Sequence, residues 1–100
     1  MKIESLMQAL HPVTQIDNFP ITVRHLQALL FLATQAEPID QGEARKRLGY
    51  HGPCMSRSVD TLGILGFAKR ARNNWDRRRS FITITPKGRD FIAKLCEASA

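Results

Sequence analysis

Long apolar runs and clustered cysteines are both missing from this sequence. No apolar stretch approaches the ~20 residues that cross a bilayer, so we expect no membrane partner. The two cysteines, Cys54 and Cys96, stand 42 positions apart, and no cysteines and histidines have the short spacing of a zinc site. We therefore expect neither a disulfide nor a metal site, and no cofactor.

Patterns typical of catalysis are missing as well. No Ser-His-Asp set, carboxylate pair or glycine-rich phosphate loop stands out, so we do not expect an enzyme. The first residues, MKIESLMQALHP, contain one lysine and an early glutamate, which is a poor match to a signal peptide. We therefore expect a cytoplasmic protein.

Acidic side chains are scarce, with 9 against 15 basic ones and a net charge of +6. The excess is local: residues 41–85 have a balance of +7, against −2 in residues 1–40 and +1 in residues 86–100. A basic segment on a globular chain favours nucleic acid as the partner, or less often an anionic membrane surface.

Length and composition predict one domain spanning residues 1–100, because 43% of these residues are hydrophobic and can fill one core. Apolar spacing and alternation predict helices at residues 2–10, 22–35, 41–48, 52–65 and from 86 onward, and strands at 67–72 and 80–85. Helices joined tightly and followed by a two-stranded ribbon make a winged helix-turn-helix, a mainly α fold with a small β-hairpin (α+β).

The boundaries of these elements rest on local chemistry. Pro12 is expected to end the first helix, because the residue before a proline is pushed out of helical geometry. Polar side chains are expected to cap the helix N-termini at Thr22, Asp40 and Thr85. Glycines are expected to end helices in the left-handed conformation at Gly49 and Gly66.

The segment SRSVDTLGILGFAKRARNNWDRRRSFITITPKGRDFI resembles the DNA-binding core of the MarR family of bacterial transcription regulators. The matching residues are Ser56, Arg57, Val59, Asp60, Leu62 and Gly66 in the recognition helix, Asp76 and Arg78 in the wing, and Ile84, Thr85 and Gly88 after it. The resemblance covers residues 21–92. It implies a DNA-binding regulator with one helix in the major groove.

The sequence also departs from that family. Only a short segment follows Pro86, where the family has longer terminal helices that form a dimer. Ser58 stands where the family tends to have leucine, and Gly63 loosens the recognition helix. On this resemblance we expect a stripped-down relative, such as one from a phage or another mobile element.

The start of the recognition helix is the expected reader of base edges. Pro53, Cys54, Ser56 and Arg57 are the candidate DNA-binding residues there, and Arg57 could give two parallel hydrogen bonds to a guanine. Alternatively, Arg57 forms a surface ion pair with Asp60. Ser56 could donate to a base or to a phosphate.

The arginine run of the wing is the second candidate contact. On an extended strand Arg77 and Arg79 would share one face and Arg78 would take the other. The resemblance makes Arg78 the candidate for a minor groove, and Asp76 is expected to brace an arginine. The alternative is that the run is only solvated.

Two further features of the hairpin are open to interpretation. Arg70 and Arg72 lie on one face of the first strand and are candidate phosphate contacts. Trp75 either packs over the hairpin or stacks near a sugar-phosphate backbone.

The leading hypothesis is therefore a sequence-specific regulator of transcription that binds double-stranded DNA. The alternative is a winged-helix module for protein interaction or for DNA architecture. Residues 1–20 and 86–100 carry apolar side chains that either close the core or form a homodimer. Cys54 at a helix N-terminus leaves a redox response as a side possibility.

Overall fold

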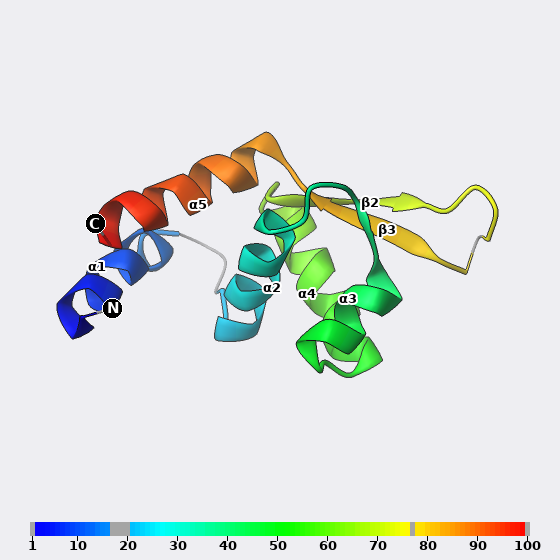
Figure 1. Ribbon diagram of the computed structural model, residues 1–100, viewed down its shortest axis with the longest axis horizontal. Helices are drawn as coiled ribbons and strands as arrows, with labels where there is room; N and C mark the ends of the chain where they lie inside the picture. The colour runs from blue at the N-terminus through cyan, green and yellow to red at the C-terminus, as the bar shows by residue number, and fades with distance from the viewer. Residues whose placement is uncertain (1, 17–20, 77, 100) are drawn as a thin grey trace.

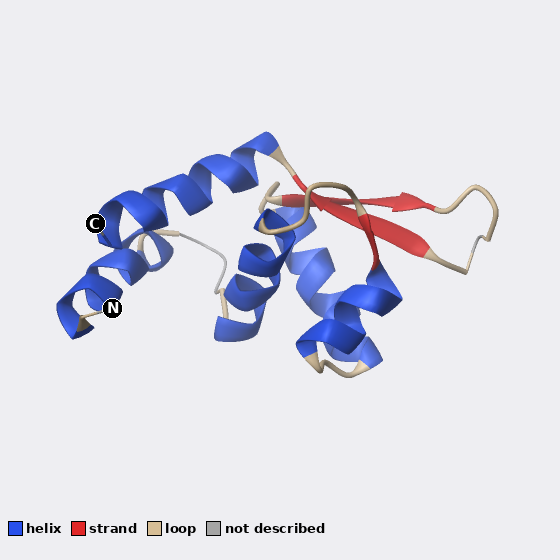
Figure 2. Cartoon of the chain, viewed as in Figure 1, coloured by secondary structure: helices blue, strands red, loops and turns tan. Residues whose placement is uncertain are grey.

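The computed structural model describes residues 2–16, 21–76 and 78–99, and it confirms the predicted fold class. Figure 2 shows helices around one end of a small sheet. Within the described residues the elements are α1 (Ile3–Thr14), α2 (Val23–Ala33), β1 (Ile39–Asp40), α3 (Gln41–Leu48), α4 (Gly52–Ile64), β2 (Ala68–Arg72), β3 (Ser80–Ile84) and α5 (Pro86–Ser99).

The predicted helix boundaries in the middle of the chain are confirmed because local hydrogen bonds make them. The Thr22 hydroxyl accepts from the backbone N–H of His25, and the Nδ1 of His25 accepts from the N–H of Thr22. Asp40 caps α3 through the N–H of Glu43. Gly49 and Gly66 end their helices with φ of 72° and 79°, where a side chain would be strained.

The sheet contains one strand more than the sequence predicted. Its order is β1-β3-β2, with both pairs antiparallel. Strand β1 is only two residues long and places Asp40 opposite Phe81 of β3. So short a strand leaves no alternating pattern to read, but it joins the beginning of α3 to the base of the hairpin.

The core lies where α2 and α4 pack against the sheet. The fully buried large side chains include Leu29 and Leu32 of α2, Met55 and Leu62 of α4 and Ile82 of β3. Burial of each stabilises the fold by about 1.5–3 kcal/mol before entropy is counted. This core holds α4 at a fixed angle to the hairpin.

The segment Ile84-Thr85-Pro86-Lys87-Gly88 joins the sheet to α5. The hydroxyl of Thr85 donates to the carbonyl oxygen of Gly66 and accepts from the N–H of Gly88. Gly88 packs so closely that an added Cβ would lie 2.3 Å from the carbonyl oxygen of Phe67. This family-like motif is therefore a structural junction.

Helices α1 and α5 form an arm that projects from the body at the end opposite the hairpin (Figure 1). The molecule is accordingly elongated, with extents of 46 × 28 × 25 Å. The predicted end of the first helix is wrong, because α1 continues through Pro12 to Thr14. Val13 and Ile16 pack against the core. This tertiary contact outweighs the tendency of the residue before Pro12 to leave helical geometry.

Apolar side chains remain exposed on this arm. Ile3, Leu6, Met7 and Leu10 of α1 are between 42% and 84% exposed. Among the described residues, none of the helices is long and apolar enough to span a membrane.

Candidate nucleic-acid interface

The first turns of α4 present an outward face. Met55, Val59 and Leu62 are buried against the body, so Pro53 and Arg57, one turn apart, point to the opposite side. Both are exposed. Among the described residues no hydrogen bond or ion pair holds the Arg57 guanidinium, which leaves it free to meet a ligand.

The expected alternative for Arg57, an ion pair with Asp60, is wrong. Asp60 instead accepts from Nη1 of Arg70 at 2.9 Å. The Nε of Arg70 donates to Oε1 of Gln41 at 3.0 Å, and its Nη2 reaches the carbonyl oxygen of Ser56 at 3.4 Å. Arg70 therefore ties β2 to α3 and α4, which fixes the hairpin relative to these two helices.

Strand register explains why Arg70 can make these bonds. Arg70 lies opposite Ile82, which is 1% exposed, so its side chain leaves the sheet on the face that covers the core. Arg72 shares that face, lies opposite Ser80 at the end of the strand, and is exposed. Of the two predicted phosphate contacts, Arg72 is the one without a partner among the described residues.

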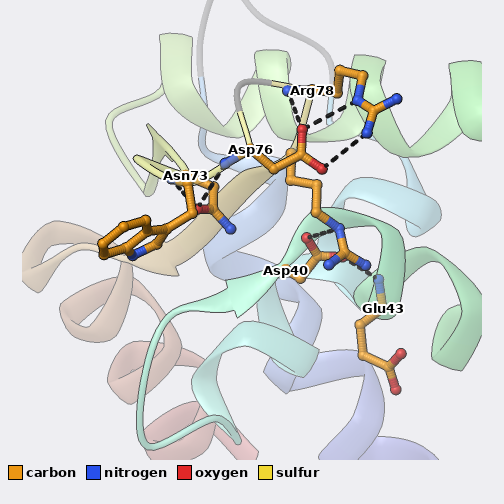
Figure 3. Close-up of polar contacts among 7 residues, drawn as sticks. Asp40, Glu43, Asn73, Asp76 and Arg78 are labelled. Carbon is orange, nitrogen blue, oxygen red and sulfur yellow. Dashed lines mark hydrogen bonds and ion pairs between the residues drawn. The ribbon is translucent and has the colours of Figure 1, made fainter.

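The wing consists of β2, β3 and the turn between them, of which residues 68–76 and 78–84 are described. Asp76 braces Arg78 in this turn, as expected (Figure 3). Oδ1 of Asp76 accepts from the backbone N–H of Arg78 at 3.0 Å and from its Nε at 3.2 Å. The hydrogen bond from the guanidinium holds the pKa of Asp76 below its usual value, helped by the N–H of Arg78. The side chain of Arg78 is 90% exposed, so the brace directs it without covering it.

The expected alternation of the three arginines along a strand is wrong for the described pair. β3 begins only at Ser80, so Arg78 and Arg79 belong to the turn. Arg77 lies outside the described residues. The Nε of Arg79 pairs with Oδ1 of Asp40 at 3.5 Å, and that carboxylate also caps α3 (Figure 3).

A hollow of about 250 Å³ lies between the wing and the beginnings of α3 and α4. Arg78 and Arg79 line it together with Lys46 of α3 and Gly52 of α4. The arginines of the wing turn and the first turn of α4 therefore border the same hollow. Arg57 lines a second hollow, of about 170 Å³, on the flank of α4 that faces Arg24 of α2.

The remaining candidates on α4 are less accessible. Cys54 is half-buried and packs against the core. Ser56 is half-buried, and its carbonyl is engaged by Arg70. Ser58 is 1% exposed, and its hydroxyl donates to the carbonyl of Cys54. A small residue at position 58 is therefore satisfied locally inside the core.

The turn before α4 is fixed to α2. The hydroxyl of Tyr50 donates to the carbonyl oxygen of Arg24 at 2.9 Å and lies 2.6 Å from Oε1 of Gln27. Burial raises the pKa of Tyr50, and burial lowers the pKa of His25 in the cap of α2. Among the described residues, no group of His, Cys, Asp and Glu could hold a metal ion.

A sequence model of the MarR family matches residues 19–79, the part of the chain that holds α2, α3, α4 and most of the wing. The chain belongs to the MarR family. No curated protein matches it.

Solved structures show the same fold. A mutant of MepR from S. aureus bound to an oligodeoxyribonucleotide is 25% identical, with a TM-score of 0.78 over 94% of this chain and 67% of that one. Tm0710 from Thermotoga maritima, a transcriptional regulator, is 24% identical, with a TM-score of 0.79 over 95% and 64%. A mutant of MarR from E. coli complexed with operator DNA is 20% identical, with a TM-score of 0.74 over 94% and 64%. This MarR-family chain thus spans about two thirds of the length of these relatives.

Sequence reasoning missed the partners of Arg70 and Arg79. Asp40 was expected only as a helix cap, and Gln41 was expected only as the first residue of a helix. The signal at Asp40 was present but incomplete, because a capping aspartate uses one oxygen and keeps the other for a cation.

Proposed function

We propose that this MarR-family chain is a sequence-specific regulator of transcription that binds double-stranded DNA. In this proposal α4 enters the major groove with Pro53 and Arg57 forward, and the wing directs Arg78 into the adjacent minor groove. The supporting observation is the bridge from Arg70 to Asp60, which locks two cationic elements into one body. A locked pair reaches DNA without losing the entropy of ordering the wing.

The roles of the basic residues differ within this proposal. Arg57, Arg72 and Arg78 expose their guanidinium groups and contact DNA. Arg70 and Arg79 position the wing, because their ion pairs tie it to Asp60 of α4 and to Asp40 at the start of α3. The ion pair of Arg78 with Asp76 stays inside the wing turn and leaves Arg78 90% exposed. Cys54 and Ser56 support these contacts from half-buried positions on α4, and Asp76 supports them by bracing Arg78. Arg77 remains a candidate contact because it belongs to the same run of three arginines.

The test is a titration of a labelled duplex, selected from a random pool, at about 50 and 200 mM salt. We expect tight binding that weakens steeply with salt, and weaker binding to a scrambled duplex. The substitution Arg57→Ala should relax the preference among sequences, because it removes a bidentate base contact worth about 1–3 kcal/mol. Lack of binding at the lower salt would favour a protein-interaction module, and equal affinity for all sequences would favour an architectural role.

We further propose that α1 and α5 mediate a homodimer. Of the eight large apolar side chains exposed among the described residues, four lie on α1. Removing such a patch from water is the usual driving force of association. In the dimer each copy would offer one α4 and one wing to a pseudo-palindromic site.

Sedimentation at micromolar concentration tests this interface. We expect a species of twice 11.3 kDa, and dissociation by Met7→Glu. The matched control is Ile64→Glu, since Ile64 is 68% exposed and Met7 64%, but Ile64 lies on α4. A wild-type chain that sediments only as a monomer removes the dimer.

A further inference from the structure

Trp75 lies in the turn of the wing and is 97% exposed. It is the single tryptophan of the sequence. The hypothesis that it packs over the hairpin is therefore wrong. A tryptophan buries about 150–250 Å² when covered, so its exposure leaves a large apolar surface in water at the far end of the wing.

The backbone beneath this side chain is held from both sides. Oδ1 of Asn73 accepts from the N–H of Trp75 at 2.8 Å and from that of Asp76 at 3.3 Å. The N–H of Asn73 donates to the carbonyl of Arg79, and the N–H of Arg79 donates to that of Asp76. These bonds hold the backbone of the turn, so Trp75 projects from an ordered turn in which Arg78 is three residues away.

The charge around the indole restricts what can cover it. The described wing residues include five basic side chains, at positions 69, 70, 72, 78 and 79, and one acidic side chain, at position 76. A partner must offer dense negative charge and an apolar surface within one indole's reach. A DNA minor groove offers both, because phosphates border walls made of deoxyribose C–H groups.

We propose that Trp75 is the apolar DNA contact of the wing and lies against a deoxyribose wall of the minor groove next to Arg78. This inference rests on the proposed function and adds a contact that carries no charge. An arginine that neutralises DNA phosphate charge releases counterions from the DNA, whereas an indole contact releases none. The two residues therefore differ in how salt affects their contributions.

The tryptophan itself reports on the contact. The test adds an unlabelled duplex, selected from a random pool, to the wild-type protein and measures quenching of the indole by acrylamide. A dye on a second sample of the duplex reports binding independently by anisotropy. We expect strong quenching without DNA, and protection with a shift of emission to shorter wavelength when the duplex binds.

Substitutions separate the indole contact from the ionic one. Trp75→Ala should weaken duplex binding about tenfold or more with an unchanged salt slope, whereas Trp75→Phe should retain most of the affinity. Arg78→Ala should lower the salt slope by about 1. Val23→Ala is the matched control, because Val23 is 83% exposed but lies on α2, and it should bind as the wild type does. Circular dichroism would verify that each variant is folded.

Three results would overturn the proposal. In the first, anisotropy reports binding while quenching of the indole is unchanged, which leaves the proposed function intact. In the second, the indole is already protected without DNA, which assigns it to a contact between protein chains. In the third, no duplex binds at low salt, which removes the proposed function together with this contact.

Discussion

Gly88 and Gly63 both lie inside helices, yet the structure predicts opposite effects when each is replaced by alanine. At Gly88 the new Cβ would lie 2.3 Å from the carbonyl oxygen of Phe67 and 2.8 Å from Cγ1 of Ile84. At Gly63 the nearest atom, the carbonyl oxygen of Ala68, would be 3.9 Å away, which is an ordinary contact.

The magnitudes follow from these distances. The atom that Gly88→Ala would strike is backbone, and the carbonyl of Phe67 also accepts from the N–H of Thr85 at 2.9 Å, so it cannot move without loss. We expect a cost at the upper end for overpacking, about 3 kcal/mol, which lowers Tm by about 12–24 °C in a domain of this size. Gly63→Ala should add about 0.8–1.0 kcal/mol of helix propensity and raise Tm by about 4–8 °C.

The assay is thermal unfolding followed by far-UV circular dichroism at one fixed protein concentration, since self-association would make Tm concentration-dependent. Urea midpoints provide a second measure if Gly88→Ala is largely unfolded at room temperature. If the Tm of Gly88→Ala equals that of the wild type, the close approach of α5 to Phe67 is not present in solution. If Gly63→Ala melts lower, the space beside α4 is not open.

Three further outcomes follow from the polar contacts. If Arg70 positions the wing, Arg70→Ala and Asp60→Ala should each weaken duplex binding, and the double variant should be no weaker than Arg70→Ala; tighter binding by Asp60→Ala would show instead that Arg70 is a phosphate contact held back by its partner. Burial lowers the folded-state pKa of His25, so the unfolded chain binds a proton on this residue more tightly than the folded chain does. The contribution of neutral His25 to folding stability is therefore complete above about pH 6.5 and is lost as the pH falls. Urea titrations at a series of pH values should accordingly show a smaller loss on acidification for His25→Gln, which keeps an acceptor for the N–H of Thr22; equal losses would contradict this. Asp40→Ala should lower the free energy of unfolding by about 1 kcal/mol through the lost cap, and Asp40→Asn by only a few tenths, because asparagine also caps well; an equal loss in both, measured by urea denaturation, would assign the effect to the charge.

Local chemistry made much of the fold predictable from the sequence. The ends of α2, α3 and α4 depend on side chains within three or four residues, such as Thr22 with His25 and Asp40 with Glu43. The same local reasoning failed at Pro12, where packing of α1 on α5 and of Val13 on the core decided the outcome. Neighbouring residues were therefore sufficient to predict a helix end where the hydrogen bonds that make it join residues close in sequence.

The candidate interface was predictable as a region but not as a set of roles. The charge balance located it in residues 41–85, and the position of Asp76 beside the arginine run predicted that it would brace one of them. Arg70 bonds to Asp60 and Gln41, which lie 10 and 29 positions away in sequence. Arg79 pairs with Asp40, which is 39 positions away. Only the folded chain brings these groups together, so the sequence alone left Arg70 and Arg79 as candidate DNA contacts.

Asp40 gives one oxygen to the first turn of α3 and the other to Arg79 of the wing. A single carboxylate thus couples fraying at the start of a helix to swinging of a hairpin. Whatever pulls Arg79 outward leaves Asp40 freer to rotate away from the N–H of Glu43, so loosening at one end of this contact should be felt at the other. Amide hydrogen exchange at Glu43 would then report on the position of the wing turn.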